Sequence, residues 1–431
     1  MSSSESKLPD RLGATLRTYA LRLKAFQPNA RLFLTNVIIL GAAMGIYRLL
    51  FNFFVLSLGY DEAFLGNLVT TSSLTALLAA LPMGYLADLI GRKTSLLVSG
   101  IFLCLSLVGM VIWPTAGMLY AMNILSGLAQ SLAGVTASPF MMENSGEQER
   151  TYLFSFSMGL QMAAASLGAW IGGYLPTWVA NYFGVDPQSS QAYAGALGIS
   201  ALVGALSLLP LVLLRSQPRR HSERSVFMPL TYARSHPRLL SKLVLPLLIT
   251  SIGAGMIMPF MNVFFREVHS QPDPVIGALF AWGALAMGLG LLIAPPLGER
   301  MGKIQLVVIT QGLSIPFLVL LGFAPWFWVS VMAYFVRLAL MNMSGPVYQT
   351  FVMEHVDPTA RATVASLTSM AWNFGWAFSP TISGKLQVQY GFGSAFLVTI
   401  VLYSIAVGLY WVFFWREGRA PQLQPTPVRE N

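Results

Sequence analysis

One short stretch decides the fold of this chain: GYLADLIGRK, residues 84–93. It lies between two long apolar runs, and its pattern of an acid, a glycine and a base at 88–92 returns, conservatively changed, at 299–303. Further outward, the pattern F-x-M-E-x6-R of residues 140–150 is found again at 351–361. Both pairs are separated by 211 residues, so we expect two halves with the same order of helices.

The composition indicates that lipid is the main solvent of the chain. Of 431 residues, 55% are hydrophobic and only 10% are charged, against roughly 25% charged in a soluble domain. A bilayer core of about 30 Å needs roughly 20 apolar residues per helix, which leaves room here for about twelve helices. Helices are expected because backbone groups in hydrocarbon must pair within their own segment. The alternating strands that mark an outer-membrane barrel are absent from the sequence.

We therefore expect an all-α membrane protein with twelve transmembrane helices in two pseudo-symmetric six-helix bundles. The expected spans are residues 33–58, 62–90, 95–113, 116–141, 152–179, 192–214, 243–266, 274–298, 304–323, 326–352, 362–388 and 392–415.

The stretches outside these spans divide the chain into five parts. Residues 9–27 alternate apolar and basic side chains at helical spacing, which predicts an amphipathic helix on the inner leaflet. The only long polar stretch between spans is a basic linker in the middle of the chain. The expected parts are a cytoplasmic N-terminal segment (1–32), a first bundle (33–215), a cytoplasmic linker (216–242), a second bundle (243–416) and a cytoplasmic tail (417–431).

The placement of charge predicts the orientation in the membrane. A net charge of +9 could suggest nucleic acid as a partner, but 22 of the 26 Lys and Arg residues fall on alternate, predicted inner segments. This is the positive-inside pattern, so we expect both termini in the cytoplasm, membrane lipids rather than nucleic acid as neighbours, and a bacterial inner membrane as the location. The single cysteine, Cys104, allows no disulfide within the chain. We expect a monomer without metal or cofactor.

The stretch 84–93 resembles the signature loop of the major facilitator superfamily, G-x-x-x-D-x-x-G-R-[KR]. The resemblance covers essentially the whole chain, because the helix number, the central linker and the repeated loop all fit. It implies a secondary transporter that works by alternating access, not an enzyme. Two halves related by an axis along the membrane normal are one known plan of such transporters.

The repeated charges predict a gate at the inner ends of the helices. Gly84 would let a neighbouring helix approach closely, Asp88 would face a helix N-terminus, and Gly91 would permit a tight turn. Glu143 is the natural partner of Arg92 in the first half, and Glu354 suits Lys303 in the second. The simpler alternative is that these charges only set topology. The full gating set is Gly84, Asp88, Gly91, Arg92, Glu143, Arg150, Glu299, Gly302, Lys303, Glu354 and Arg361.

Small residues in spans five and eleven resemble, imperfectly, an element of drug:proton antiporters, G-x3-G-P-x2-G-G. Ala169 takes the place of its proline, and Asn123 stands where such antiporters carry an arginine in span four. Both departures count against that assignment. Helix packing is the commoner use of such small residues, among them Gly168 and Gly172.

Polar residues inside the spans predict a substrate site. In this superfamily spans one, four, seven and ten line the central cavity, so the resemblance places five of six candidate side chains there; Asn373, in span eleven, is a further polar candidate. An arginine at mid-bilayer costs about 2.5–3.5 kcal/mol on insertion scales and usually faces a cavity. No Asp or Glu occupies the middle third of any span, which suggests an anionic ligand; bonding of each arginine within the protein is the alternative. The six residues are Arg48, Asn52, Gln130, Asn262, Arg337 and Asn373.

Several functions remain open at this point. The first is transport of a small organic or amphiphilic solute, with anions among the candidates. The others are broad drug efflux, flipping of a lipid or lipid-linked substrate, and a non-transporting receptor or sensor on the same fold. If protons drive transport, the carboxyl groups near the outer ends (Asp61, Glu62 and Glu267) are the candidates to carry them.

Overall fold

The computed structural model describes residues 26–215, 236–356 and 361–415, and these residues are built from helices. The first half holds α2 (Pro28–Ser57), α3 (Glu62–Ile90), α4 (Arg92–Ile112), α5 (Ala116–Glu143), α6 (Glu147–Phe183), α7 (Ser190–Leu206) and α8 (Leu208–Val212). The second holds α10 (Pro237–Ile257), η1 (Met258–Phe260), α11 (Met261–Glu267), α12 (Asp273–Met301), α13 (Lys303–Phe323), α14 (Phe327–Glu354), α15 (Arg361–Tyr390) and α16 (Phe392–Phe414).

Hydropathy and length support membrane crossing by most of these helices. Within the described residues, ten helices are long and apolar enough to span a bilayer. The two remaining expected spans fall on α6 and α15, which are helices of 37 and 30 residues. The all-α membrane fold is confirmed. The expected amphipathic helix, most of the linker (216–235) and the tail lie outside the described residues.

Proline explains two of the differences between the observed helices and the expected spans. The second half begins at Pro237 instead of residue 243, because proline is well tolerated in the first turn of a helix, where its missing N–H would have no partner. The expected span 243–266 is not one continuous α-helix. It narrows to a 3-10 turn at Met258–Phe260, where Pro259 cannot donate the hydrogen bond that would continue the α-helix.

The repeat seen in the sequence is also a repeat of helix boundaries. Residue 273 begins α12 211 positions after residue 62 begins α3, and α3 and α12 also end 211 residues apart. The same offset relates both ends of α4 to α13 and of α5 to α14. Gly91 and Gly302 precede α4 and α13 with φ of +87° and +92°, a conformation that favours glycine. The tight turn expected at Gly91 is confirmed.

The described residues group into two compact units. Among the described residues, unit 1 comprises 26–60, 71–215 and 271–281, and unit 2 comprises 61–70, 236–270, 282–356 and 361–415. The first turns of α3 therefore belong to unit 2, and the first turns of α12 to unit 1.

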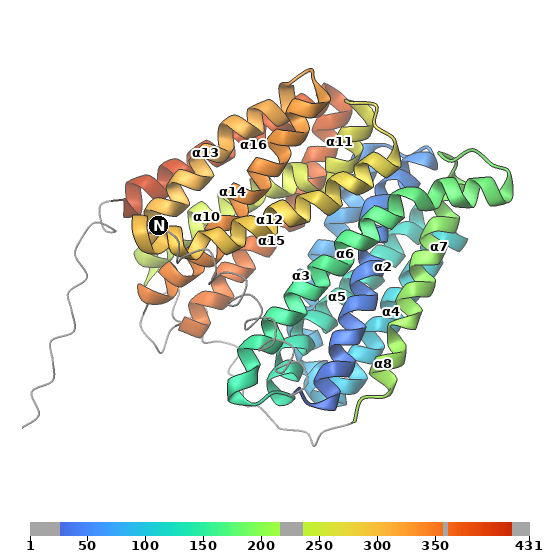
Figure 1. The fold of residues 1–431 in the computed structure, drawn as a ribbon, viewed down its shortest axis with the longest axis horizontal. Coiled ribbons are helices and arrows are strands. Elements are labelled where there is room, and N and C mark those ends of the chain that lie inside the picture. The colour runs from blue at the N-terminus through green and yellow to red at the C-terminus, as the bar shows by residue number, and fades with distance from the viewer. Residues whose placement is uncertain (1–25, 216–235, 357–360, 416–431) are drawn as a thin grey trace, which may run out of the picture. The chain divides into compact units, whose positions relative to one another are not determined.

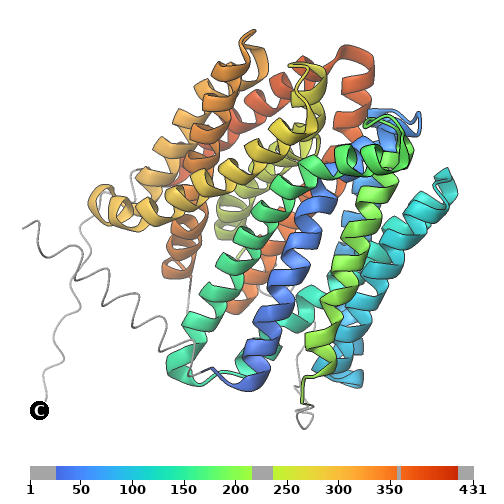
Figure 2. The ribbon, with the colours of Figure 1, turned by 45° about the vertical axis from the view of Figure 1, so that its right-hand side comes forward.

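Within unit 1, α2 packs closely on α6, as Figures 1 and 2 both show. A Cβ at Gly45 would overlap the carbonyl of Ala165, and one at Gly168 would overlap the carbonyl of Ala42. Gly168 thus serves helix packing. An apolar core within this unit includes Phe33 of α2 and Phe140 of α5, whose ring centroids lie 5.1 Å apart.

Within unit 2, α10 and α15 repeat this arrangement. A Cβ at Gly375 would overlap Ser251, and one at Gly255 would lie 2.9 Å from the Cβ of Ser379. Ser379 stands 211 positions after Gly168, so equivalent positions make the close helix contact in both units. The core of unit 2 gathers aromatic side chains of α14 and α16, with the rings of Tyr348 and Tyr410 5.0 Å apart.

The starts of α3 and α12 make matching seams. In unit 2, a Cβ at Gly66 would overlap the carbonyl of Pro380, and the backbone N–H of Thr381 donates to Thr70 Oγ1 at 3.2 Å. In unit 1, the equivalent Gly277 lies against Ala169, where a Cβ would be 2.6 Å from its carbonyl oxygen. These glycines, which have no side chain, allow the backbones of two neighbouring helices to come into direct contact.

Candidate gating and substrate sites

Arg92, the first residue of α4, joins three helices of unit 1. Its Nη2 lies 2.8 Å from Asp88 Oδ1 at the end of α3, and its Nε lies 3.3 Å from Glu143 Oε1 at the end of α5. The pairing expected between Arg92 and Glu143 is confirmed. Because all three side chains are partly exposed, each pair contributes at most about 1 kcal/mol. Bonds this weak can be broken and remade during a transport cycle.

Unit 2 contains the equivalent pair. Lys303 Nζ, at the start of α13, forms an ion pair with Glu354 Oε1 at the end of α14. This second expected pairing is confirmed as well. Glu299, the counterpart of Asp88, is exposed at the end of α12.

Three other residues of the expected gate differ from the sequence prediction. Gly84 has no described atom within 4 Å of the position that a Cβ would take, so it does not serve a close helix contact within its unit. Arg150 is half-buried, and its Nε has no hydrogen-bond partner among the described residues. Arg361 is exposed at the first residue of α15.

Sequence reasoning missed the role of Lys93, the last residue of the signature stretch. Its Nζ donates to the carbonyl oxygens of Val212 and Leu214, at 2.8 and 2.7 Å. Val212 is the last residue of α8 and Leu214 follows shortly after it, so the ammonium group lies at a helix C-terminus, where a cation is favoured. The start of α4 is thereby tied to the last described residues before the central linker, a contact that depends on where α8 ends and leaves no local pattern in the sequence.

The expected substrate residues of unit 1 lie on α2 and α5. Arg48 is exposed, and no described residue forms a hydrogen bond or ion pair with it. Asn52, one turn further along α2, is buried. Gln130 is exposed on α5 and donates from Nε2 to Ser126 Oγ at 3.1 Å.

Arg337 in unit 2 lies in a different environment from the one expected. Its side chain is fully buried between α14 and α16, with 0% of its surface exposed. Nη2 donates to Tyr403 Oη at 3.2 Å, and Cζ lies 5.5 Å from the centre of the Tyr403 ring. Asn262, on α11, is also buried. These contacts join neighbouring helices within the unit.

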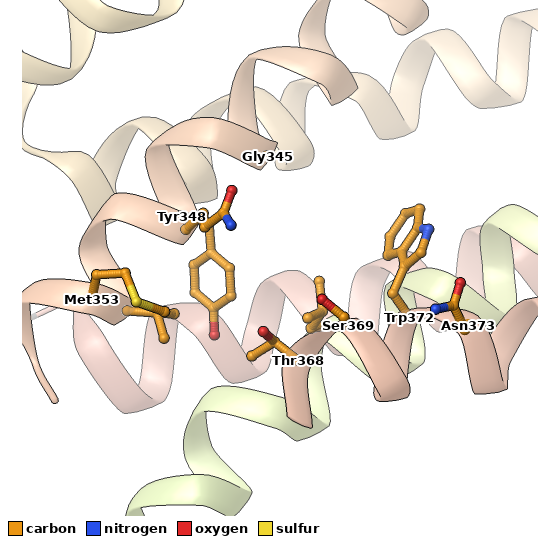
Figure 3. Close-up of a pocket in the computed structure, with 10 residues that line it drawn as sticks. Gly345, Tyr348, Met353, Thr368, Ser369, Trp372 and Asn373 are labelled. Atoms are coloured by element: carbon orange, nitrogen blue, oxygen red, sulfur yellow. The ribbon is translucent and has the colours of Figure 1, made fainter. Parts of the chain in front are cut away.

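Unit 2 has a pocket of about 370 Å³ between α10, α14 and α15, within the range usual for small-molecule sites. Figure 3 shows Tyr348 and Met353 on α14 beside Thr368, Ser369, Trp372 and Asn373 on α15. Asn373 is the one expected substrate residue that lines it. No charged side chain is among the lining residues, which are Leu247, Gly345, Tyr348, Gln349, Val352, Met353, Thr368, Ser369, Trp372 and Asn373.

The chemistry of this pocket is amphipathic. Trp372 and Met353 offer a large ring and a flexible thioether, which adapt to apolar ligands of varied shape. Gln349 and Asn373 offer amide groups that can both donate and accept hydrogen bonds. Such a lining binds neutral or weakly charged molecules that have apolar bodies and a few polar atoms.

The carboxyl groups expected near the outer ends are partly brought together. The side chains of Glu62 on α3 and Glu267 on α11 lie near one another in unit 2, so their like charges interact. At the equivalent seam of unit 1, Asp273 Oδ2 accepts instead from the hydroxyl of Tyr193 at 2.8 Å.

Comparison with known proteins decides the family. The sequence profile of the Major Facilitator Superfamily matches residues 32–380 and 243–429. The chain belongs to the Major Facilitator Superfamily. It is a multi-pass integral membrane transporter of small molecules, not an enzyme.

Curated relatives and solved structures agree with this membership. The chain is 25% identical over 393 residues to a protein of Dickeya zeae named multidrug resistance protein MdtG, covering 88% of this chain and 92% of that protein. It is 23% identical to the protein of the same name from Proteus mirabilis, covering 79% and 82%.

Its fold is similar to that of the nucleoside transporter NupG, with a TM-score of 0.70, 16% identity and coverage of 89% and 98%. It is also similar to a bacterial homologue of the human lysosomal transporter Spinster, with a TM-score of 0.71, 14% identity and coverage of 94% and 99%.

Within this MFS transporter, most of the pocket lining was not predicted. Ser369 and Asn373 are one helical turn apart, as are Gln349 and Met353, so each pair occupies one face of its helix. That spacing was the available signal. It was hidden because polar residues on an apolar helix could equally serve contacts between helices.

Proposed function

We propose that this transporter exports hydrophobic and amphiphilic compounds of varied structure. The observation that carries the proposal is the uncharged, amphipathic pocket of unit 2, which Trp372 and Asn373 of α15 both line. The curated relatives named multidrug resistance protein MdtG support it. An adaptable apolar lining with a few amide groups suits a broad range of substrates better than a single polar nutrient.

The gate proposed for this export is the doubled set of inner charges. The ion pairs of Arg92 and Lys303 tie the ends of neighbouring helices within their units. In alternating access, helix bundles rock around a central site, and the inner contacts must open when the substrate enters from that side. Their modest strength suits contacts that break once in every cycle.

We place the protein in the inner membrane of a bacterium, as a monomer with both termini in the cytoplasm. The relatives that carry the MdtG name are bacterial, and 22 of 26 basic residues fall on the expected inner segments. Membrane lipids are then its neighbours, and a small molecule or amphiphile is its substrate.

The pocket is tested by dye efflux into inverted membrane vesicles. Trp372→Ala removes the largest apolar surface and should raise the substrate concentration for half-maximal transport about 10- to 100-fold, as loss of a buried aromatic anchor does. Trp328→Ala is the matched control, because Trp328 is 72% exposed and does not line the pocket. Equal transport by all three proteins would refute the pocket as a substrate site.

Introducing a charge at residue 373 tests which class of substrate the pocket binds. Asn373→Asp adds a carboxylate to the pocket and should favour cationic dyes over neutral ones by about tenfold, with Asn373→Lys doing the reverse. Competition between a cationic and a neutral dye measures this preference directly. If neither variant changes it, Asn373 does not contact the substrate.

A second candidate substrate is an anionic solute, favoured by Arg48. This arginine is exposed and has no acceptor among the described residues, so its planar fork of donors is available to a carboxylate or phosphate. Arg48→Lys keeps the charge but loses the bidentate geometry. We expect at least a tenfold loss of uptake for an anionic amphiphile and none for a neutral one, measured in the same vesicles. Equal loss for both compounds would make Arg48 structural.

A further inference from the structure

Arg337 presents donors that the described protein does not satisfy. Its guanidinium is fully buried inside unit 2, and only Nη2 has a hydrogen-bond acceptor, the hydroxyl of Tyr403. Nε and Nη1 have no hydrogen-bond partner among the described residues. A guanidinium has no acceptor of its own, so these N–H groups need an acceptor from elsewhere.

Tyr403 adds another donor at the same place. Its oxygen accepts the bond from Arg337 Nη2, and no described residue accepts its own O–H. The hydroxyl proton is therefore available to point at whatever Nε and Nη1 bind. The site combines N–H and O–H donors with one full positive charge, and no carboxylate pairs with it among the described residues.

Glycines on the helices around Arg337 leave room for the aromatic rings beside it. Gly253 of α10 faces Tyr403, where a Cβ would lie 2.6 Å from the ring. Gly283 of α12 faces Tyr334, one turn before Arg337 on α14, where a Cβ would lie 3.1 Å from the ring. Small residues on two helices thus admit the tyrosines that flank the guanidinium.

The charge belongs to one half of the chain only. The residue 211 positions before Arg337 is Ser126, a neutral side chain that is also buried. The fold of a unit therefore does not require an arginine at this position. A buried charge without a counter-ion is strongly destabilising, and the contact with the Tyr403 ring offsets only part of that cost.

We propose that Arg337 and Tyr403 bind a small inorganic monovalent anion, such as chloride, in the interior of unit 2. The anion accepts from Nε, Nη1 and Tyr403 Oη and neutralises the guanidinium. It links α14 to α16 and is separate from the substrate pocket, because neither residue lines that pocket. A water molecule would satisfy the hydrogen bonds but would leave the charge unpaired.

The test is the thermal unfolding of the purified protein at fixed ionic strength, with chloride replaced stepwise by gluconate, which is too large for a closed interior. We expect the melting temperature to rise with chloride or bromide and to saturate, as binding to the folded state requires. Tyr403→Phe keeps the ring but removes the hydroxyl, and should raise the half-saturating chloride concentration about tenfold.

Two further variants separate this site from general salt effects. Arg337→Met should abolish the response to chloride and should be no less stable than the wild type in gluconate. Arg300→Met is the matched control, because Arg300 is exposed at the end of α12 and should leave the chloride response unchanged.

A crystal grown in bromide gives an independent measurement. An anomalous peak within hydrogen-bonding distance of Nε or Nη1 of Arg337 is the expected result. A wild-type melting temperature that is the same in chloride and gluconate overturns the proposal, as does a bromide crystal without that peak. If Arg337→Met fails to fold, the chloride titration of Tyr403→Phe and the bromide crystal still test the proposal.

Discussion

At the scale of single residues, Gly91 shows how a backbone conformation places a charge. Its positive φ turns the chain between α3 and α4, so that Arg92 begins the next helix and reaches carboxylates on both sides. This arrangement could be predicted because the pattern is local and is repeated in the second half. The environment of Arg337 could not, since it depends on Tyr403 and Gly253, which other helices bring in.

Neutralising Glu143 tests the gate of unit 1. Glu143→Gln removes one of the two ion pairs of Arg92, and we expect a several-fold lower transport rate with unchanged expression and substrate binding. Rates and binding are measured on the same vesicle preparation. Glu149→Gln, at the start of α6, is the control, because Glu149 has no ion pair among the described residues. Wild-type rates in both variants would leave these charges with a role in topology alone.

At the scale of helices, close packing depends on a few positions without a side chain. α2 and α6 meet at Gly45 and Gly168, and α10 and α15 meet at Gly255 and Gly375. The sequence predicted which stretches are helices, because apolar runs of sufficient length leave no other choice in lipid. It could not predict which glycine faces a backbone, since Gly84 and Gly45 look alike until the neighbouring helix is in place.

Adding one methyl group tests this packing. Gly45→Ala should lower the free energy of unfolding by about 1–3 kcal/mol, because its Cβ overlaps the carbonyl of Ala165 and the helices must move apart. Gly134→Ala, in α5, has open space around the new Cβ and should gain about 0.5–1 kcal/mol from helix propensity. Thermal unfolding in detergent measures both. Equal effects from the two changes would show that α2 and α6 do not need this close approach.

At the scale of the whole molecule, orientation is still a prediction from charge. Reporter fusions after Ser216, in the expected linker, and at Asn431 should both report the cytoplasmic side, because the surrounding segments carry most of the basic residues. A fusion within the loop that contains Asp186, between α6 and α7, should report the outer side. If any of the three fusions reports the opposite side of the membrane, the proposed topology is wrong.

The equal spacing of α3, α4 and α5 with α12, α13 and α14 also bears on how the gene can change. A duplicated segment usually accumulates insertions and deletions, yet neither copy has gained or lost a residue relative to the other from 62 to 143 and from 273 to 354. One extra residue within a helix would turn everything after it by about 100° and carry lipid-facing side chains into the protein. Substitutions have separated the two copies almost everywhere, so the number of residues has been harder to alter here than their identity.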